Sequence, residues 1–239
     1  MSRDLSPLPR MIAYYGSKWR ISKRYSQPLH DTIIEPFAGG AGYSLHHYQR
    51  NIILCDTDEI VCAVWGYLIR STRESILRLP LLAQGQSVDE LNICQEAKWL
   101  IGFWVNSAIC RPRKTLSRWA VESIKESNGK CVNFWSEGCR ERLAKSVGKI
   151  SHWEVRCADY REIEDVEATW FIDPPYIGMG HHYHSDELDY ETLASWCKSR
   201  RGQVIVCELS GASWLPFVPF TETVNARKKN RKEVIWQRA

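Results

Sequence analysis

The sequence predicts an α/β protein: a Rossmann-like, mainly parallel sheet with an antiparallel C-terminal hairpin and an inserted helical subdomain. Three observations predict this fold. Short apolar runs alternate with helical stretches in the first third of the chain and again from about residue 152. Several of these runs end at a glycine loop or at an aspartate. The stretch between them is helix-like and contains no clear strand. Alternating strands and helices are typical of a parallel sheet with helices on its faces.

The first part of the chain begins this alternation. The expected elements are, in order, a strand within residues 32–37, a helix over 43–50, a strand at 52–55 and a helix over 59–70. A glycine-rich loop, residues 38–42, separates the first strand from the first helix. We expect residues 1–70 and 152–239 to form one domain, split by a helical subdomain at residues 71–151, because the alternation stops and then resumes.

The second part of the chain resumes the alternation. The expected elements are strands at 152–157 and 169–172, a helix from about 186 to 200, a strand at 203–207, and two extended segments between 217 and 236. The last two segments surround a basic turn, which is typical of an antiparallel hairpin added to the edge of a mainly parallel sheet.

Composition excludes several classes of protein. The 239 residues are 44% hydrophobic and 25% charged, with a net charge of +4, so disorder, collagen and coiled coil are excluded. No run approaches eighteen apolar residues, and the N-terminal segment lacks the apolar core of a signal peptide. We therefore expect a cytoplasmic protein without a membrane partner. The nine cysteines include no CxxC pair, and we expect reduced thiols.

The expected strand ends carry groups that suit a ligand. The glycine loop, Asp56, Asp159 and Asp173 each follow an apolar run. Ligands bind outside the carboxyl ends of the strands in open α/β sheets. Glycines let backbone approach a ligand closely, although such a loop can also be an ordinary strand-to-helix turn. An acidic residue at the end of the second strand can accept hydrogen bonds from ribose hydroxyls, whereas the absence of GxGxxG disfavours NAD.

The tetrapeptide Asp173-Pro174-Pro175-Tyr176 is the most specific element. Two prolines stiffen the turn and remove two N–H donors. The Asp173 carboxylate and the Pro174 carbonyl can accept hydrogen bonds from an exocyclic amino group, and Tyr176 can stack on a flat base. An ordinary proline turn is the alternative.

In these motifs and in their order, the chain resembles the Dam-type DNA adenine-N6 methyltransferases, which use S-adenosylmethionine. The segments that carry the resemblance are residues 14–18 (YYGSK), 35–42 (EPFAGGAG), 56–58 (DTD), 159–160 (DY) and 173–176 (DPPY). It covers roughly residues 12–70 and 152–239, and residues 71–151 match only as a variable target-recognition region would. Ser17 stands where the family usually has a second glycine, and Tyr14 where tryptophan is frequent.

The resemblance implies transfer of a methyl group from S-adenosylmethionine to N6 of an adenine flipped out of duplex DNA. It implies the catalytic residues Asp173, Pro174, Pro175 and Tyr176. It implies the cofactor-binding residues Tyr14, Tyr15, Lys18, Phe37, Ala38, Gly39, Gly40, Asp56, Asp58, Asp159, Tyr160 and Asp173. Lys18 would hold the cofactor's carboxylate. The alternatives are an RNA adenine or cytosine-N4 methyltransferase, and a non-catalytic DNA-binding protein with the same fold.

Two basic runs are candidates for contact with DNA phosphates. Their residues are Arg111, Arg113, Lys114 and Arg118 in the middle of the chain, and Lys228, Lys229 and Arg231 in the expected hairpin. Contacts with phosphates give affinity for DNA but little specificity for its base sequence. A solvated surface is the alternative for either run. We expect double-stranded DNA as the partner of a monomer.

Two further features are less informative. The spacing of His181, His182 and His184 does not place three ligands on one helical face, so we expect no metal site. Glu208 follows an expected strand, where it could line the cleft or cap a turn.

Overall fold

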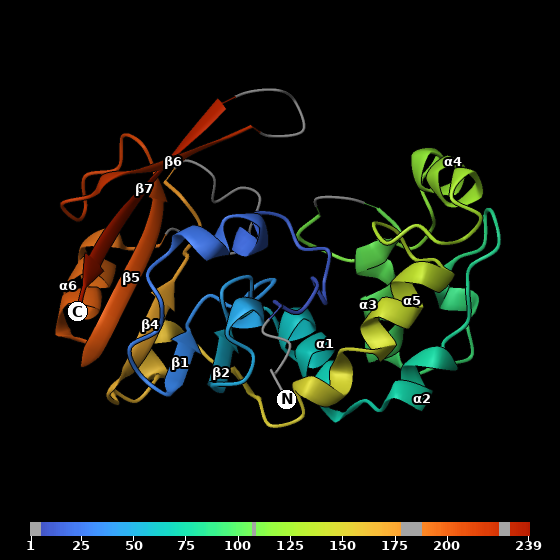
Figure 1. The fold of residues 1–239 in the computed structure, drawn as a ribbon, viewed down its shortest axis with the longest axis horizontal. Helices are drawn as coiled ribbons and strands as arrows, with labels where there is room; N and C mark the ends of the chain where they lie inside the picture. Colours follow the sequence, from blue (N-terminus) through green and yellow to red (C-terminus); the bar gives the residue numbers. More distant parts are fainter. Residues whose placement is uncertain (1–5, 107–108, 178–187, 225–229) are drawn as a thin grey trace. The chain divides into compact units, whose positions relative to one another are not determined.

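A computed structural model describes residues 6–106, 109–177, 188–224 and 230–239, apart from the side chains of residues 223–231. Its sheet has seven strands in the order β3-β2-β1-β4-β5-β7-β6 (Figure 1). The strands are β1 (Thr32–Glu35), β2 (Asn51–Asp56), β3 (Glu154–Cys157), β4 (Ala168–Ile172), β5 (Gly202–Leu209), β6 (Val218–Val224) and β7 (Asn230–Arg238). The pairs β1–β2, β1–β4 and β4–β5 are parallel, whereas β5–β7 and β6–β7 are antiparallel.

The helices are mostly found in the middle of the chain. They are α1 (Glu59–Arg70), α2 (Arg73–Leu77), α3 (Gln95–Trp104), α4 (Arg118–Glu126), α5 (Glu137–Ala144) and α6 (Tyr190–Ser199). Short 3₁₀ turns are η1 (Lys18–Arg20), η2 (Ser22–Arg24), η3 (Ser44–His46), η4 (Val88–Glu90), η5 (Val147–Lys149) and η6 (Tyr160–Glu162). Within the described part of the chain, no helix has the length and apolar character needed to cross a membrane.

The chain divides into two compact units. Unit 1 comprises Met1–Arg24, Gly39–Gln49 and Asp58–Val155, and unit 2 comprises Tyr25–Ala38, Arg50–Thr57 and Arg156–Ala239. Unit 2 carries nearly all of the sheet, and unit 1 carries α1 to α5. The predicted boundaries at residues 71 and 151 stay a prediction.

The core of unit 2 lies around the central strands. All five residues of β4 are buried, as a strand covered on both faces requires. Helix α6 packs its apolar residues Leu193, Ala194 and Cys197 onto β4 and β5 (Figure 1). The helix begins after Asp189 because that side chain accepts hydrogen bonds from the N–H groups of Glu191 and Thr192.

Unit 1 is built on buried aromatic side chains. Trp65 on α1 and Trp104 on α3 are fully buried, and each indole N–H donates to a backbone carbonyl, of Gly39 and of Met11. Helices α1 and α3 pack together, as do α2 and α5 (Figure 1). Buried indoles need such acceptors, so these bonds fix the helices to the N-terminal segment and the glycine loop.

The structure confirms most of the predicted elements. The predicted helix over residues 59–70 is α1, and the described residues between 71 and 151 contain helices and no named strand. The C-terminal segments form the predicted antiparallel pair, in which β7 joins β5 and β6 is the edge strand. The predicted start of α6 falls on residues 186–187, outside the described residues, and the helix is described from Tyr190.

The helix predicted over residues 43–50 is wrong. Only the single turn η3 forms there. Ala41 already has a positive φ of 46°, and the N–H groups of His46 and His47 bond three residues back, to Tyr43 and Ser44. The segment must then reach the start of β2, where Asn51 donates to the carbonyl of Asp31. These bonds close a 3₁₀ turn, and residues 47–50 then bend and turn towards β2 instead of adding a helical turn.

Candidate functional site

The carboxyl ends of β1, β2 and β3 meet in unit 2. The N–H of Ala38, after β1, donates to the carbonyl of Cys55 in β2 at 2.8 Å. The N–H of Ala158, after β3, donates to the carbonyl of Asp56 at 3.0 Å. The residues after the three strands therefore lie side by side, as predicted, with the half-buried side chain of Asp56 among them.

An aromatic pair stands at this edge. The rings of Phe37 and Tyr160 lie 5.5 Å apart at an angle of 34°. Tyr160 is buried and meets Trp196 of α6 edge-on at 5.1 Å. Phe37 is only half-buried and packs against the core of unit 2, so part of its ring stays accessible to a ligand.

Asp159 makes a local cap beside that pair. Its carboxylate accepts hydrogen bonds from the backbone N–H of Arg161 at 2.9 Å and from the Arg161 guanidinium at 2.7 Å. Burial alone would raise the pKa of Asp159, but these bonds from Arg161 hold it below its usual value. The side chain is therefore ionised at neutral pH and fixes the turn into η6.

The tetrapeptide follows β4 and is held at two points. The Tyr190 hydroxyl, on α6, donates to the Pro175 carbonyl at 2.6 Å. The Tyr176 hydroxyl donates to Oε2 of Glu233, on β7, at 2.8 Å. Asp173 is half-buried beside this turn. The turn is thus fixed both to a helix and to the antiparallel part of the sheet.

The surroundings of Asp173 are rich in acidic and phenolic groups. Burial, followed by the nearby Asp173 and Glu233, raises the pKa of Tyr176 well above its usual value. Burial raises the pKa of Tyr25 in the same way, with further contributions from Cys207, Glu233 and Asp173. Both phenols therefore stay protonated and can only donate or share their protons at neutral pH.

Glu208, at the end of β5, belongs to the same neighbourhood. It is 1% exposed and accepts hydrogen bonds from the Leu209 N–H at 2.8 Å and the Trp214 indole N–H at 3.1 Å. Burial raises its pKa; hydrogen bonds from Leu209, Trp214 and the Ile177 backbone oppose this rise, and Asp173 adds to it. Its carboxylate therefore ties the residue after the tetrapeptide to the β5 end.

Unit 1 holds the glycine loop against the segment at residues 14–18. Gly39 has a φ of +42°, and a Cβ there would lie 2.9 Å from the Tyr14 ring. A Cβ on Gly40 would lie 3.0 Å from Ser17 Oγ. A Cβ on Gly42 would lie 2.5 Å from the Trp19 backbone nitrogen. The loop must be glycine-rich because this segment approaches it so closely.

Polar groups of the same unit have defined places. The buried Lys18 donates from Nζ to the Gly16 carbonyl at 3.1 Å. Ser17 Oγ is buried and has no hydrogen-bond partner among the described residues. The N–H of Tyr15 donates to Ile109 at 3.0 Å. Asp58 caps α1 by accepting from the N–H of Ile60 at 2.9 Å, which is a structural role.

The predicted DNA-binding residues are scattered. Lys114 forms an ion pair with Asp89 at 2.6 Å, and Arg118 forms one with Glu122 at 3.1 Å. Arg111 and Arg113 are exposed. Lys228 and Lys229 lie outside the described residues, as do His181, His182 and His184, and for Arg231 only the backbone, opposite Thr223, is described.

Unit 2 thus brings together Phe37, Asp56, Asp159, Tyr160 and the tetrapeptide, and unit 1 brings residues 14–18 to Gly39 and Gly40. Sequence reasoning missed Glu233, Tyr190 and Trp214. No local signal marks Glu233, because only the strand order brings β7 beside β5.

All nine cysteines lie in described parts of the chain and carry free thiols. No family model and no curated protein sequence matches the chain.

Proposed function

We propose that this protein is a DNA methyltransferase that transfers a methyl group from S-adenosylmethionine to N6 of adenine in duplex DNA. One observation carries the proposal: in unit 2, a carboxylate, an aromatic pair and the Asp-Pro-Pro-Tyr turn follow adjacent parallel strands. These are Asp56 at the end of β2, Phe37 after β1 with Tyr160 after β3, and Asp173 after β4. The resemblance of the same motifs to Dam-type methyltransferases supports it.

The strand order supports a Rossmann-like sheet. The run β3-β2-β1-β4-β5 is the order of a doubly wound dinucleotide-binding sheet, which changes direction between β1 and β4. Ligands of such sheets bind outside the strand ends at this switch point. Phe37 follows β1 and Asp173 follows β4, and the two strands pair in parallel through Ile33 with Thr169. The inserted recognition subdomain at residues 71–151 is part of this proposal.

The residues at the strand ends fit the cofactor. Asp56 supplies carboxylate oxygens for two ribose hydroxyls, and the half-buried face of Phe37 supplies a surface for an adenine ring. In unit 1, the buried Ser17 Oγ, which has no hydrogen-bond partner among the described residues, supplies a hydroxyl for a polar group. Lys18 keeps its role toward the cofactor's carboxylate as a prediction from the sequence.

S-adenosylmethionine, when bound, supplies a methyl group on an electron-poor sulfonium sulfur. The protein's task is to make the adenine amino nitrogen nucleophilic. The Asp173 carboxylate and the Pro174 carbonyl accept hydrogen bonds from the two N6 protons, which draws the nitrogen lone pair out of conjugation with the ring. The stiff turn holds both acceptors in place and so lowers the orientational cost of reaction.

The target base must leave the duplex to reach these acceptors. Tyr190 and Glu233 hold the turn before any base arrives, so the acceptors need not reorganise. Tyr176 is only 8% exposed and its hydroxyl is bonded within unit 2, so its stacking on the base stays a prediction from the sequence.

The proposal is tested by incubating the protein with methyl-labelled S-adenosylmethionine and unmethylated duplex DNA, and then identifying the labelled nucleoside. We expect N6-methyladenine, and its loss in both Asp173→Ala and Asp173→Asn. Asp31→Ala is the matched control, because the Asp31 side chain is 86% exposed and pairs with Arg50 at the surface. Label in RNA or in N4-methylcytosine would mean that the substrate is RNA or cytosine and not adenine in DNA. Label in no nucleic acid would favour a non-catalytic binding protein.

A further inference from the structure

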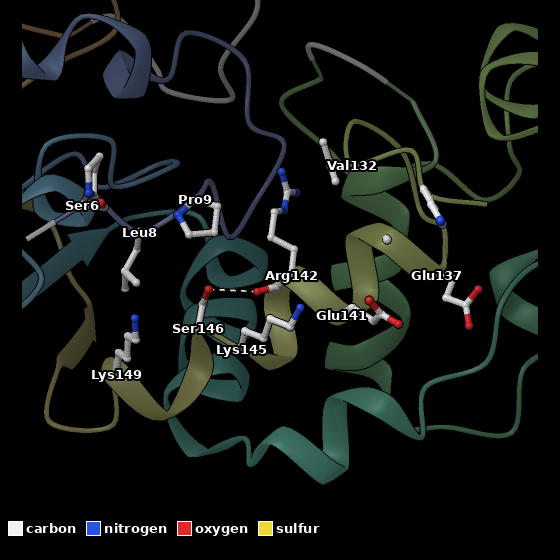
Figure 2. Close-up of a pocket in the computed structure, with 13 residues that line it drawn as sticks. Ser6, Leu8, Pro9, Val132, Glu137, Glu141, Arg142, Lys145, Ser146 and Lys149 are labelled. Carbon is white, nitrogen blue, oxygen red and sulfur yellow. Dashed lines mark hydrogen bonds between the residues drawn. The ribbon is translucent and has the colours of Figure 1, made fainter. Parts of the chain in front are cut away.

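Unit 1 contains a groove beside helix α5 with a volume of about 530 Å³ (Figure 2). Its lining residues come from the N-terminal segment, from the turn before α5, and from α5 and η5. They are Ser6, Pro7, Leu8, Pro9, Lys130, Val132, Glu137, Gly138, Glu141, Arg142, Lys145, Ser146 and Lys149. The volume is in the range of small-molecule binding sites.

Charge is unevenly distributed along this groove. Arg142, Lys145 and Lys149 follow one another at the end of α5 and into η5, whereas Glu137 lies at the start of α5 (Figure 2). Both lysines are exposed. Among the described residues, no ion pair joins any lining cation of the groove to a carboxylate. Glu141, one residue before Arg142, is the carboxylate at this end, so three cations outnumber one anion there.

A second arginine reinforces that end. The guanidinium carbons of Arg142 and Arg10 lie 4.8 Å and 5.8 Å from the centroid of the same Trp104 ring. Burial, followed by the like charges of Arg142 and Arg20, lowers the pKa of Arg10. The Arg142 guanidinium donates a 3.7 Å hydrogen bond to Cys139 Sγ, and its buried Nε has no hydrogen-bond partner among the described residues. The Arg10 guanidinium donates a 3.5 Å hydrogen bond to the side-chain oxygen of Asn133.

Such an arrangement is costly without an anion. Guanidinium groups prefer bidentate hydrogen bonds to carboxylates or phosphates, and like charges that share one indole repel each other. A phosphate would supply oxygen acceptors and remove the repulsion. The other groove wall is apolar, formed by Pro7, Leu8 and Pro9, and suits a sugar rather than a second charge.

We infer that the groove lined by Arg142, Lys145, Lys149 and Pro7–Pro9 binds the phosphodiester backbone of duplex DNA. The choice of duplex DNA rests on the proposed function. The groove differs from the basic residues predicted from the sequence, of which Lys114 and Arg118 already have carboxylate partners. It is a new phosphate site that holds the duplex without reading its bases.

The test measures the affinity of the full chain for a fluorescein-labelled duplex, by anisotropy, over a series of salt concentrations. The variant is Lys145→Glu with Lys149→Glu, two exposed positions outside the core. Lys198→Glu, at an exposed position of α6 in unit 2, is the control that changes charge outside the groove. Thermal melting checks that each variant folds, and Arg142→Lys adds a variant that keeps the charge but loses the bidentate fork.

We expect the double variant to bind the duplex at least about tenfold more weakly. The slope of log affinity against log salt concentration should fall in magnitude by about 1.8, or about 0.9 per lost phosphate contact. The control should bind like the wild type. Equal weakening in variant and control, or no weakening in the variant, would overturn the inference. A third result would also overturn it: tripolyphosphate competes in the wild type, and the double variant abolishes this competition while its affinity for the duplex stays unchanged. The groove would then bind a free phosphate and not DNA.

Binding of S-adenosylmethionine is measured on the same samples. We expect it to be unchanged by the double variant. If the wild type binds no S-adenosylmethionine, the proposed activity is wrong, while the duplex measurement still decides whether the groove binds DNA.

Discussion

The Tyr176 hydroxyl donates a 2.8 Å hydrogen bond to Oε2 of Glu233, and both residues are only 8% exposed. The bond joins the turn after the parallel strand β4 to the antiparallel strand β7, 57 residues later. A buried carboxylate needs such a donor. The contact therefore couples the position of the Asp-Pro-Pro-Tyr turn to the C-terminal hairpin.

Tyr176→Phe should destabilise the protein. It removes the donor and leaves the Glu233 carboxylate buried without that hydrogen bond, at a cost of about 1–3 kcal/mol. Urea unfolding of the wild type and of the variant measures the difference. Tyr176→Phe combined with Glu233→Gln should recover part of the loss, since no charge is then left without its donor. An unchanged free energy of unfolding in the single variant would contradict the coupling.

Tyr190→Phe should slow methyl transfer and leave the affinity for S-adenosylmethionine unchanged. The Tyr190 hydroxyl holds the Pro175 carbonyl at 2.6 Å, so the bond acts on the turn and not on the proposed cofactor residues Asp56 and Phe37. A hydrogen bond of this kind contributes about 0.5–1.5 kcal/mol, so the rate should fall severalfold. Single-turnover kinetics and equilibrium dialysis separate the two effects. A loss confined to cofactor affinity would show that Tyr190 does not act through the turn.

Glu208 should make stability depend on pH. Burial raises its pKa in the folded protein, so its contribution to stability is fully present below the ordinary carboxyl pKa and is lost as pH rises through the raised folded value. Glu208→Gln removes this titration and keeps an acceptor for Trp214. The free energy of unfolding of the wild type minus that of the variant should therefore fall between acidic and neutral pH. A difference that is constant or rises with pH would refute this role.

Gly42→Ala should be strongly destabilising. Its Cβ would lie 2.5 Å from the Trp19 nitrogen and 2.9 Å from Lys18 backbone atoms, which cannot move as a side chain would. Overpacking of this kind costs about 1–3 kcal/mol. Gly148→Ala is the control, because a Cβ there meets nothing within 4 Å. Thermal melting should separate the two variants clearly, and equal melting temperatures would mean that the loop tolerates a side chain.

Much of the fold could be predicted from local patterns. The apolar run of β4 is buried throughout, and a run bounded by turn residues signals such a strand. The helix predicted over residues 59–70 is α1, which begins after the cap residue Asp58. The glycine loop and the aspartates at strand ends could be predicted to converge, because parallel strands bring their carboxyl ends to one edge.

The rest depends on contacts between distant residues. The helix predicted over residues 43–50 does not form, because the segment closes only a 3₁₀ turn after the positive φ of Ala41 and then bends into β2. Glu233 has no local mark, since its partner Tyr176 is set by the strand order. The cationic groove could not be predicted from local sequence, because its walls come from residues 6–9 and from residues 130–149, which are far apart in the chain.

The most direct measurement is mass spectrometry of nucleosides from unmethylated duplex DNA, after incubation with S-adenosylmethionine whose methyl group carries three deuterium atoms. The account predicts trideuterated N6-methyladenine with the wild-type protein and none with Asp173→Asn. Deuterium absent from adenine in the wild-type reaction, or equal labelling by Asp173→Asn, would contradict it.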